Sequence, residues 1–331
     1  MGFSAVGSLF SDSLLGKWGA LALRWVSFLA AFFVSEIQAD QLRSQDESLY
    51  QALSRTVIRL EQVSYNNAEQ SEIRQPMGTG FFVQYEQALY LVTVRHLAAR
   101  GMVLRVRVPA QSNSGQTIDL IELRVPAKSW VVHPSEQTAL SNNARNRQTP
   151  AVVNPVDVAA ARLPWPQAYQ LAPLRFCPAD CPNGPNQLAD SDPEPPEGIL
   201  VFGYPRYLGV ELMVQRPLAR VGIVAMAASE PFIRYSVGNS YADARMLVVD
   251  VRAFGGNSGS PVFRKDRFTS RRTLLGIISG GENSLDLSFA EPVSRIKETI
   301  EWAHTQNPSA EAKWIPPQKK ATERGRTKLS Y

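Results

Sequence analysis

The sequence contains few of the residues that metal sites and dense disulfide frameworks require. Only two of its 331 residues are cysteine and only three are histidine. The histidines lie far apart and have no metal-ligand spacing, and the loop CPADC holds both cysteines without a nearby histidine pair. We therefore expect no metal site. In an oxidising compartment, Cys177 and Cys181 would instead form a short-range disulfide.

Long hydrophobic runs are also missing. The apolar run Trp25 to Val34 has ten residues, fewer than the ~20 that a membrane-spanning helix needs, and Arg24 prevents its extension. Basic residues precede this run and the small residue Ala39 follows it, which is the layout of a secretory signal. We expect a signal peptide over residues 1–39, cleaved after Ala39, then a linker over 40–54. The protein is accordingly predicted to be periplasmic or secreted, with an uncleaved membrane anchor as the alternative.

A large surplus of charge of either sign is absent. The formal net charge is +5, which by itself does not indicate nucleic-acid binding, and we expect no nucleic-acid partner. Basic residues gather in the loop Arg264 to Arg272 and in the tail, residues 305–331, which we expect to be disordered because it has no apolar period. These segments are interpreted either as solvated surface charge or as weak contacts to anionic cell-envelope polymers.

Regular helical patterns are scarce. A 3.6-residue apolar period holds convincingly only over Val293 to His304. From Arg55 onward, short runs rich in Val, Leu, Phe and Tyr are separated by Gly, Pro and Asn turns, which is typical of β-strands. No repeat of solenoid length is present. We therefore predict an all-β domain over residues 55–304, closed into one or two barrels, with one terminal helix.

Three polar residues stand at the ends of apolar β-runs, where function is usually located. His96 follows ALYLVTVR, Asp157 begins the run DVAAARL, and Ser258 lies in VRAFGGNSGSPVF. A serine hydroxyl is a poor nucleophile until a base takes its proton; an imidazole suits that role, and a carboxylate on the other ring nitrogen orients it. The glycines allow a turn in which the N–H groups of Gly256 and Ser258 face a developing oxyanion. Each residue alone has an ordinary explanation, but together and in this order they indicate a catalytic triad.

Six segments between roughly Thr56 and Ala303 resemble the trypsin-like serine proteases of the chymotrypsin fold, of the bacterial exported type. In that family's order they are GTGFFV, YLVTVRH, DVAAARL, FGYP, GGNSGSPVF and LLGIIS. The resemblance implies two six-stranded antiparallel β-barrels with a C-terminal helix, and a site in the crevice between the barrels. It also implies a serine endopeptidase that forms an acyl-enzyme without a cofactor, with His96 as general base, Asp157 as orienting carboxylate and Ser258 as nucleophile.

The same resemblance suggests where a protein or peptide substrate would bind. The segment Ser279-Gly280-Gly281 matches the strand that pairs with the substrate backbone and walls the primary specificity pocket in this family. Arg252 stands six residues before Ser258, near the family's pocket floor, where a buried arginine would favour an acidic substrate side chain. The alternative is that Arg252 pairs with Asp250 on the same strand face. The oligomeric state has no signature in the sequence.

Two other functions are compatible with these residues. A protease-like fold that has lost turnover would be a binding protein of the cell envelope, and the same triad could serve an exported esterase. An α/β-hydrolase is excluded, because glycine follows Ser258 directly, whereas the hydrolase elbow reads G-x-S-x-G and its triad runs in the order Ser, acid, His.

Overall fold

The computed structural model divides the chain into two units, Met1–Gln51 and Ala52–Tyr331, and every described residue belongs to the second. The described residues are 53, 55–66, 71–98, 104–112, 118–135, 156–166, 169–177, 187–205, 217–229, 233–237, 240–265, 273–282, 285–306 and 312–315. The expected signal peptide, nearly all of the linker, loop residues 266–272 and tail residues 316–331 lie outside them. No helix within the described ranges is long and apolar enough to span a membrane.

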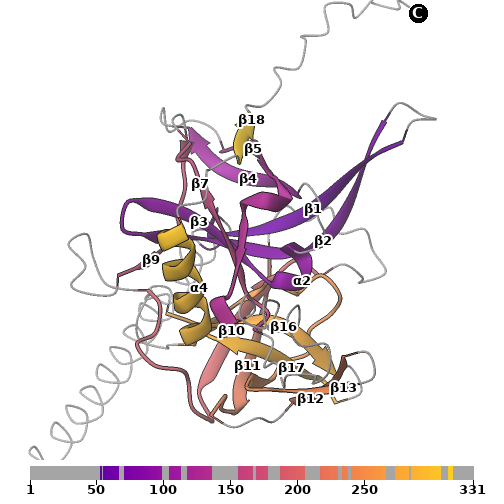
Figure 1. The fold of residues 1–331 in the computed structure, drawn as a ribbon, viewed down its shortest axis with the longest axis vertical. Coiled ribbons are helices and arrows are strands. Elements are labelled where there is room, and N and C mark those ends of the chain that lie inside the picture. Colours follow the sequence, from indigo (N-terminus) through magenta and orange to yellow (C-terminus); the bar gives the residue numbers. More distant parts are fainter. Residues whose placement is uncertain are drawn as a thin grey trace, which may run out of the picture. The chain divides into compact units, whose positions relative to one another are not determined.

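The first half of the second unit, together with strand β18 from its C-terminal end, forms a ten-stranded sheet (Figure 1). Along the main path, the hydrogen-bonded order is β18 (Lys313–Ile315), β5 (Ile118–Val125), β4 (Leu104–Ser112), β1 (Val57–Asn66), β2 (Ser71–Tyr85), β3 (Ala88–Thr93), β7 (Ala159–Leu163) and β6 (Trp130–Val132). Two short strands lie off this path: β8 (Tyr169–Gln170) pairs with β4, and β9 (Leu174–Phe176) pairs with β2. All six residues of β3 are buried, which explains why its sequence ALYLVT shows no polar alternation.

The second half is a closed six-stranded barrel. Its strands follow the order β10 (Gly198–Gly203), β11 (Leu218–Met226), β14 (Leu247–Asp250), β17 (Leu287–Pro292), β16 (Leu274–Glu282) and β15 (Pro261–Arg264). A separate hairpin, β12 (Ile233–Val237) with β13 (Ser240–Ala244), connects β11 to β14. The barrel strands carry many fully buried apolar residues, among them Val249, Leu274 and Ile277.

The all-β prediction is confirmed, and the barrel half has the expected six strands. The other half differs in detail. The short strands β8, β9 and β18 bring its sheet to ten strands, and among the described strands its ladder ends at β18 and β6. Strand β18 pairs with β5, whereas β8 and β9 pair with the stretches of β4 and β2 that β1 does not reach. Runs of two or three residues carry no periodic signal that a sequence could show.

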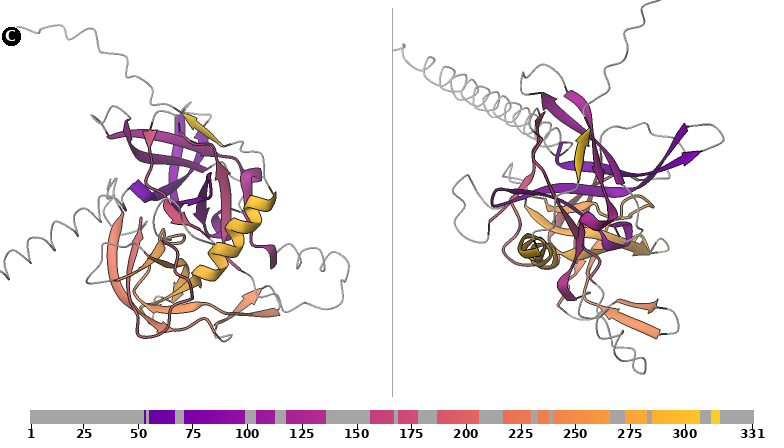
Figure 2. Two further views of the ribbon diagram at one scale, coloured as in Figure 1. Left: turned by 90° about the vertical axis from the view of Figure 1, so that its left-hand side faces the viewer. Right: turned by 45° about the horizontal axis from the view of Figure 1, so that its top comes forward.

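Helix α4 (Val293–Gln306) connects the two halves. Val293, Ile296, Ile300 and Ala303 are buried at helical spacing, so one apolar face is covered. The helix packs against β6 and β7 of the first sheet and against β16 and β17 of the barrel (Figure 2). The helix expected over Val293 to His304 is confirmed and extends two residues further.

Strand β18 corrects the expectation of a disordered tail from residue 305 onward. Lys313 to Ile315 pair antiparallel with β5. Trp314 holds the strand in place, because its ring lies 6.2 Å from that of Phe82 and its Nε1–H donates to the carbonyl oxygen of Pro164 at 2.7 Å. One aromatic residue in a polar, proline-containing segment is enough to dock three residues, and such a short contact leaves no pattern in the sequence.

Candidate active site

His96 lies in a single helical turn, α2 (Arg95–Ala98), which follows β3 directly. The turn is closed by the N–H groups of Leu97 and Ala98, which both donate to the carbonyl oxygen of Val94. Leu97 and Ala98 are buried and anchor the turn. The His96 side chain is therefore presented from a fixed base while 38% of it remains exposed.

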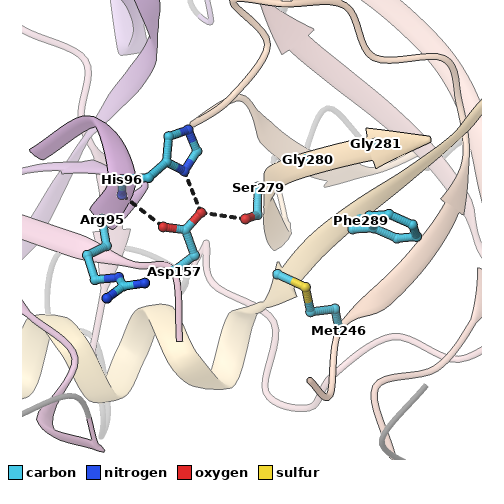
Figure 3. Close-up of a pocket in the computed structure, with 8 residues that line it drawn as sticks. All are labelled: Arg95, His96, Asp157, Met246, Ser279, Gly280, Gly281 and Phe289. Carbon is cyan, nitrogen blue, oxygen red and sulfur yellow. Dashed lines mark hydrogen bonds and ion pairs between the residues drawn. The ribbon is translucent and has the colours of Figure 1, made fainter. Parts of the chain in front are cut away.

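Asp157 lies just before β7 and makes three hydrogen bonds through its carboxylate (Figure 3). Oδ1 accepts from the backbone N–H of His96 at 2.9 Å, and Oδ2 lies 2.7 Å from His96 Nδ1. Oδ2 also accepts from the hydroxyl of Ser279 at 2.5 Å. Only 12% of the Asp157 side chain is exposed. The carboxylate therefore fixes both the ring and the backbone of His96, and it favours the tautomer with the proton on Nδ1.

Ser258 lies in a turn that depends on glycine. Gly256 has φ of 96° and Gly259 has φ of 87°, a region that residues with a Cβ rarely adopt. A Cβ on Gly259 would also lie 1.9 Å from the carbonyl oxygen of Thr79. Thr79, in β2, holds the turn from the first sheet: its N–H donates to Ser258 O at 2.8 Å and its hydroxyl donates to Gly256 O at 3.0 Å.

Two N–H groups of this turn are available to a ligand. The N–H of Asn257 donates to Phe254 O and the N–H of Gly259 donates to Ile278 O. By contrast, no described residue accepts a hydrogen bond from the N–H of Gly256 or of Ser258. A pair of unsatisfied donors beside a hydroxyl is the arrangement that an oxyanion requires.

Ser279 connects the serine to the aspartate. The hydroxyl of Ser258 donates to the carbonyl oxygen of Ser279 at 3.4 Å, while the hydroxyl of Ser279 donates to Asp157. Among the described contacts, none joins Ser258 Oγ to His96. The structure therefore places His96 and Asp157 in direct contact. Ser258 and Asp157 both contact Ser279, and the hydrogen bond from the Ser258 hydroxyl is weak. A change of the Ser258 χ1 angle would break it.

A cavity of about 360 Å³ opens beside the His96–Asp157 pair (Figure 3). It is lined by Arg95, His96, Asp157, Met246, Ser279, Gly280, Gly281 and Phe289. A Cβ on Gly280 would meet no atom within 4 Å, so the strand leaves space here. Residues Gly280 to Glu282 pair with β17 on one side, and no described strand pairs with them on the other, because the β15 ladder reaches only Ile277. The free edge of β16 can therefore accept an extended peptide.

The structure does not bring Arg252 into this cavity, so it does not support the expected pocket floor. Half of the Arg252 side chain is exposed, its Nε lies 3.2 Å from Asp286 Oδ1, and its guanidinium lies over the ring of Phe254. The alternative pairing with Asp250 is not formed either. The turn at Leu285 and Asp286, which sequence periodicity does not place, supplies the nearer carboxylate.

The expected disulfide involves a residue that the structure does not describe. Cys177 follows β9, whereas Cys181 lies outside the described residues, and the pairing stays a prediction. Within the described part of the chain, no group of three or more His, Cys, Asp or Glu side chains is arranged to hold a metal ion.

A buried acid lies behind Asp157. Glu291, in β17, is 2% exposed, and its Oε1 accepts the backbone N–H of Asp157 at 2.7 Å. Burial is the main cause that raises the pKa of Glu291 to about 8. The hydrogen bond from Asp157 N–H lowers this pKa, the negative charge of Asp157 raises it, and Arg295 and Arg95 lower it. Glu291 is therefore mostly protonated at neutral pH.

Comparison with known proteins identifies the family. Residues 78–268, which include His96, Asp157 and Ser258, match the trypsin-like peptidase domain. The chain belongs to this family. This peptidase domain is accordingly that of a serine protease, a hydrolase that acts on proteins or peptides.

Solved structures of serine proteases are similar to the peptidase at low sequence identity. The Rv3671c protease from M. tuberculosis, in its active form, is 16% identical with a TM-score of 0.43, over 76% of this chain and 82% of that one. The serine endoprotease from Yersinia pestis is 15% identical with a TM-score of 0.46, over 79% of this chain and 67% of that one. A search of curated protein sequences finds no match.

Sequence reasoning missed several residues of the site. Met246 and Phe289 line the cavity but look like ordinary core residues in the sequence, and no signal distinguishes them. Thr79 stands between two glycines, which suggests a close approach without showing to what. Glu291 could have been found from the sequence, because it is an acid inside the apolar run LSFAEPV. A carboxyl group buried among apolar residues is a candidate for a functional site.

Proposed function

We propose that this peptidase is an exported serine endopeptidase in which Ser258 is the nucleophile, His96 the general base and Asp157 the orienting carboxylate. The observation that carries the proposal is the pair of contacts from the Asp157 carboxylate to His96, one to ring Nδ1 at 2.7 Å and one to the backbone N–H at 2.9 Å. These contacts leave Nε2 as the basic nitrogen of the ring. The two unsatisfied N–H groups of Gly256 and Ser258 support the same proposal.

The proposed reaction follows from this arrangement. Ser258 Oγ attacks the carbonyl carbon of the substrate and its proton passes to His96 Nε2. The resulting oxyanion is bound by the N–H groups of Gly256 and Ser258, and Asp157 stabilises the imidazolium. Collapse of the intermediate breaks the C–N bond, and the leaving amine takes the proton from His96. Water, activated by the same imidazole, then hydrolyses the acyl-enzyme.

The substrate backbone is proposed to lie along the free edge of β16 at Ser279, Gly280 and Gly281. This edge passes directly beside Asp157 and borders the cavity. An extended peptide paired there places successive side chains alternately toward and away from the cavity. Met246 and Phe289 give the cavity an apolar wall.

A fluorophosphonate probe tests the catalytic proposal. We expect the probe to label the wild-type chain and to leave Ser258→Ala unlabelled, because only an activated serine hydroxyl displaces its fluoride. Ser260→Ala is the matched control, since the Ser260 hydroxyl is buried and has no hydrogen-bond partner among the described residues. Labelling of Ser258→Ala, or the absence of labelling in wild type and in both variants, would contradict the proposal. The second result would favour a binding protein without turnover.

Export is inferred from the basic residues, apolar run and Ala39 of the N-terminal segment. We expect the mature chain isolated from a secreting host to begin at Asp40. N-terminal sequencing of the envelope and medium fractions checks this, and recovery of only full-length chain in the cytosol would argue against export.

A further inference from the structure

The contact between Glu291 and Asp157 joins residues that are distant in the chain. Asp157 precedes β7 of the first sheet, and Glu291 belongs to β17 of the barrel, 134 positions later. The Glu291 side chain is 2% exposed and its Oε1 accepts the Asp157 N–H at 2.7 Å. A hydrogen bond this well buried is costly to break, because the N–H would be left without a partner.

The backbone of Asp157 has only two such supports among the described hydrogen bonds. Its N–H is held by Glu291, and its carbonyl oxygen accepts from the N–H of Arg95 at 3.3 Å. The Arg95 contact comes from α2, the same turn that carries His96. Glu291 is therefore the support that comes from the barrel, and it fixes the residue whose side chain orients His96.

We propose that Glu291 is a positioning residue of the active site: its carboxyl group holds the Asp157 peptide so that the Asp157 carboxylate stays against His96. The inference rests on the proposed roles of Asp157 and His96. Glu291 touches neither the substrate edge of β16 nor the hydroxyl of Ser258 in any described contact. It acts through the aspartate, as the partners of a metal-bound histidine act through the histidine.

The protonation state of Glu291 determines which side chains can replace it. With a pKa raised to about 8, the group is a neutral acid at neutral pH, and its carbonyl oxygen still accepts the Asp157 N–H. A neutral acceptor adds no second negative charge beside Asp157. The charged groups that act on Glu291 are Asp157, Arg95 and Arg295. A glutamine has the same shape and an equivalent carbonyl oxygen, so it should replace Glu291 below pH 7.

The test compares Glu291→Gln with Glu291→Met. Methionine has a similar volume but offers no strong acceptor to the Asp157 N–H. In a peptide-hydrolysis assay at pH 6.5, we expect Glu291→Gln to keep kcat within about 3-fold of wild type. We expect Glu291→Met to lose kcat by roughly 10- to 100-fold with little change in KM, since small displacements of catalytic groups have effects of this order. Above pH 8, wild-type kcat should fall as two carboxylates come to repel each other, and Glu291→Gln should not show this fall.

The experiment must distinguish a general loss of stability in Glu291→Met from a displacement of Asp157. Thr299→Val is the control: Thr299 is fully buried in α4, and its hydroxyl donates to the backbone carbonyl oxygen of Arg295 at 2.7 Å, not to Glu291, Asp157 or His96. We expect Thr299→Val to lower the melting temperature without lowering kcat. As a direct readout, the proton on His96 Nδ1, assigned with Asp157→Asn, should resonate far downfield in wild type and Glu291→Gln. In Glu291→Met this resonance should shift upfield or broaden.

Each outcome bears on the proposal. If Glu291→Met keeps wild-type kcat and an unchanged His96 resonance, Glu291 is not a positioning residue. If Glu291→Gln loses kcat as strongly as Glu291→Met, the hydrogen-bond argument is overturned. If the wild type itself is inactive, the proposed function fails, and the resonance of His96 in the two variants still decides whether Glu291 positions Asp157.

Discussion

The clearest quantitative consequence of the buried acid concerns stability against pH. In the folded state Glu291 holds a proton up to about pH 8, whereas in the unfolded chain its pKa is close to the ordinary glutamate value of 4.5. Between these values, unfolding releases a proton. The free energy of unfolding of the wild type therefore contains a contribution that is fully present below pH 4.5 and is lost as the pH rises through 8.

Glu291→Gln removes this contribution because glutamine does not titrate. Each pKa unit corresponds to about 1.4 kcal/mol, so the raised pKa implies a total of roughly 5 kcal/mol. The difference in unfolding free energy, variant minus wild type, should thus rise by at most about 1.4 kcal/mol per pH unit from pH 5 and level off above pH 8. Relative to wild type, the glutamine variant becomes the more stable chain at alkaline pH.

Urea unfolding followed by tryptophan fluorescence at one-unit steps from pH 5 to 9 measures this difference. Both chains should carry Ser258→Ala, which prevents autolysis and leaves Glu291 untouched. Groups that titrate in both chains cancel in the difference. A difference that stays constant within about 1 kcal/mol over this range would refute the reasoning, because it would mean that Glu291 titrates alike in the folded and unfolded states.

Two further predictions concern backbone and packing. Gly259→Ala should destabilise the fold by about 3 kcal/mol or more, because φ is 87° there and the new Cβ would lie 1.9 Å from Thr79 O; thermal denaturation checks this, and an unchanged melting temperature would contradict it. Trp314→Ala should cost about 1–2 kcal/mol by removing the Phe82 ring contact and one hydrogen bond. Urea unfolding measures that cost, and Trp314→Phe, which keeps an aromatic ring but has no N–H donor, should recover part of it.

The sequence was informative wherever function or folding requires a local pattern. Alternating and continuous apolar runs predicted the strands, and the helical period of Val293 to His304 predicted α4. The glycines around Ser258 predicted a turn with two free N–H groups, because residues with a Cβ rarely adopt the φ values found at Gly256 and Gly259. The contact of His96 with Asp157 followed from the order of the residues and the family resemblance, rather than from either residue alone.

What could not be predicted depends on contacts between distant segments. Trp314 docks on Phe82, more than two hundred positions earlier, and no local pattern announces such a contact. Arg252 forms an ion pair with Asp286, which lies in a turn that the strand pattern does not predict. Glu291 reaches Asp157 across the two halves of the unit. In each case the two partners meet only in the folded structure. A single side-chain contact contributes too little energy to leave a recognisable pattern in the surrounding sequence.

The position of α4 and Glu291 in the chain has a consequence for when activity arises. Both come after Ser258, so a chain emerging during synthesis contains His96, Asp157 and Ser258 before it contains the parts that join and fix them. Domains form as units once their interacting segments are available. Until residues 287–306 have been made, the chain therefore contains Ser258 but lacks both Glu291, which holds the Asp157 N–H, and the helix that packs on both sheets.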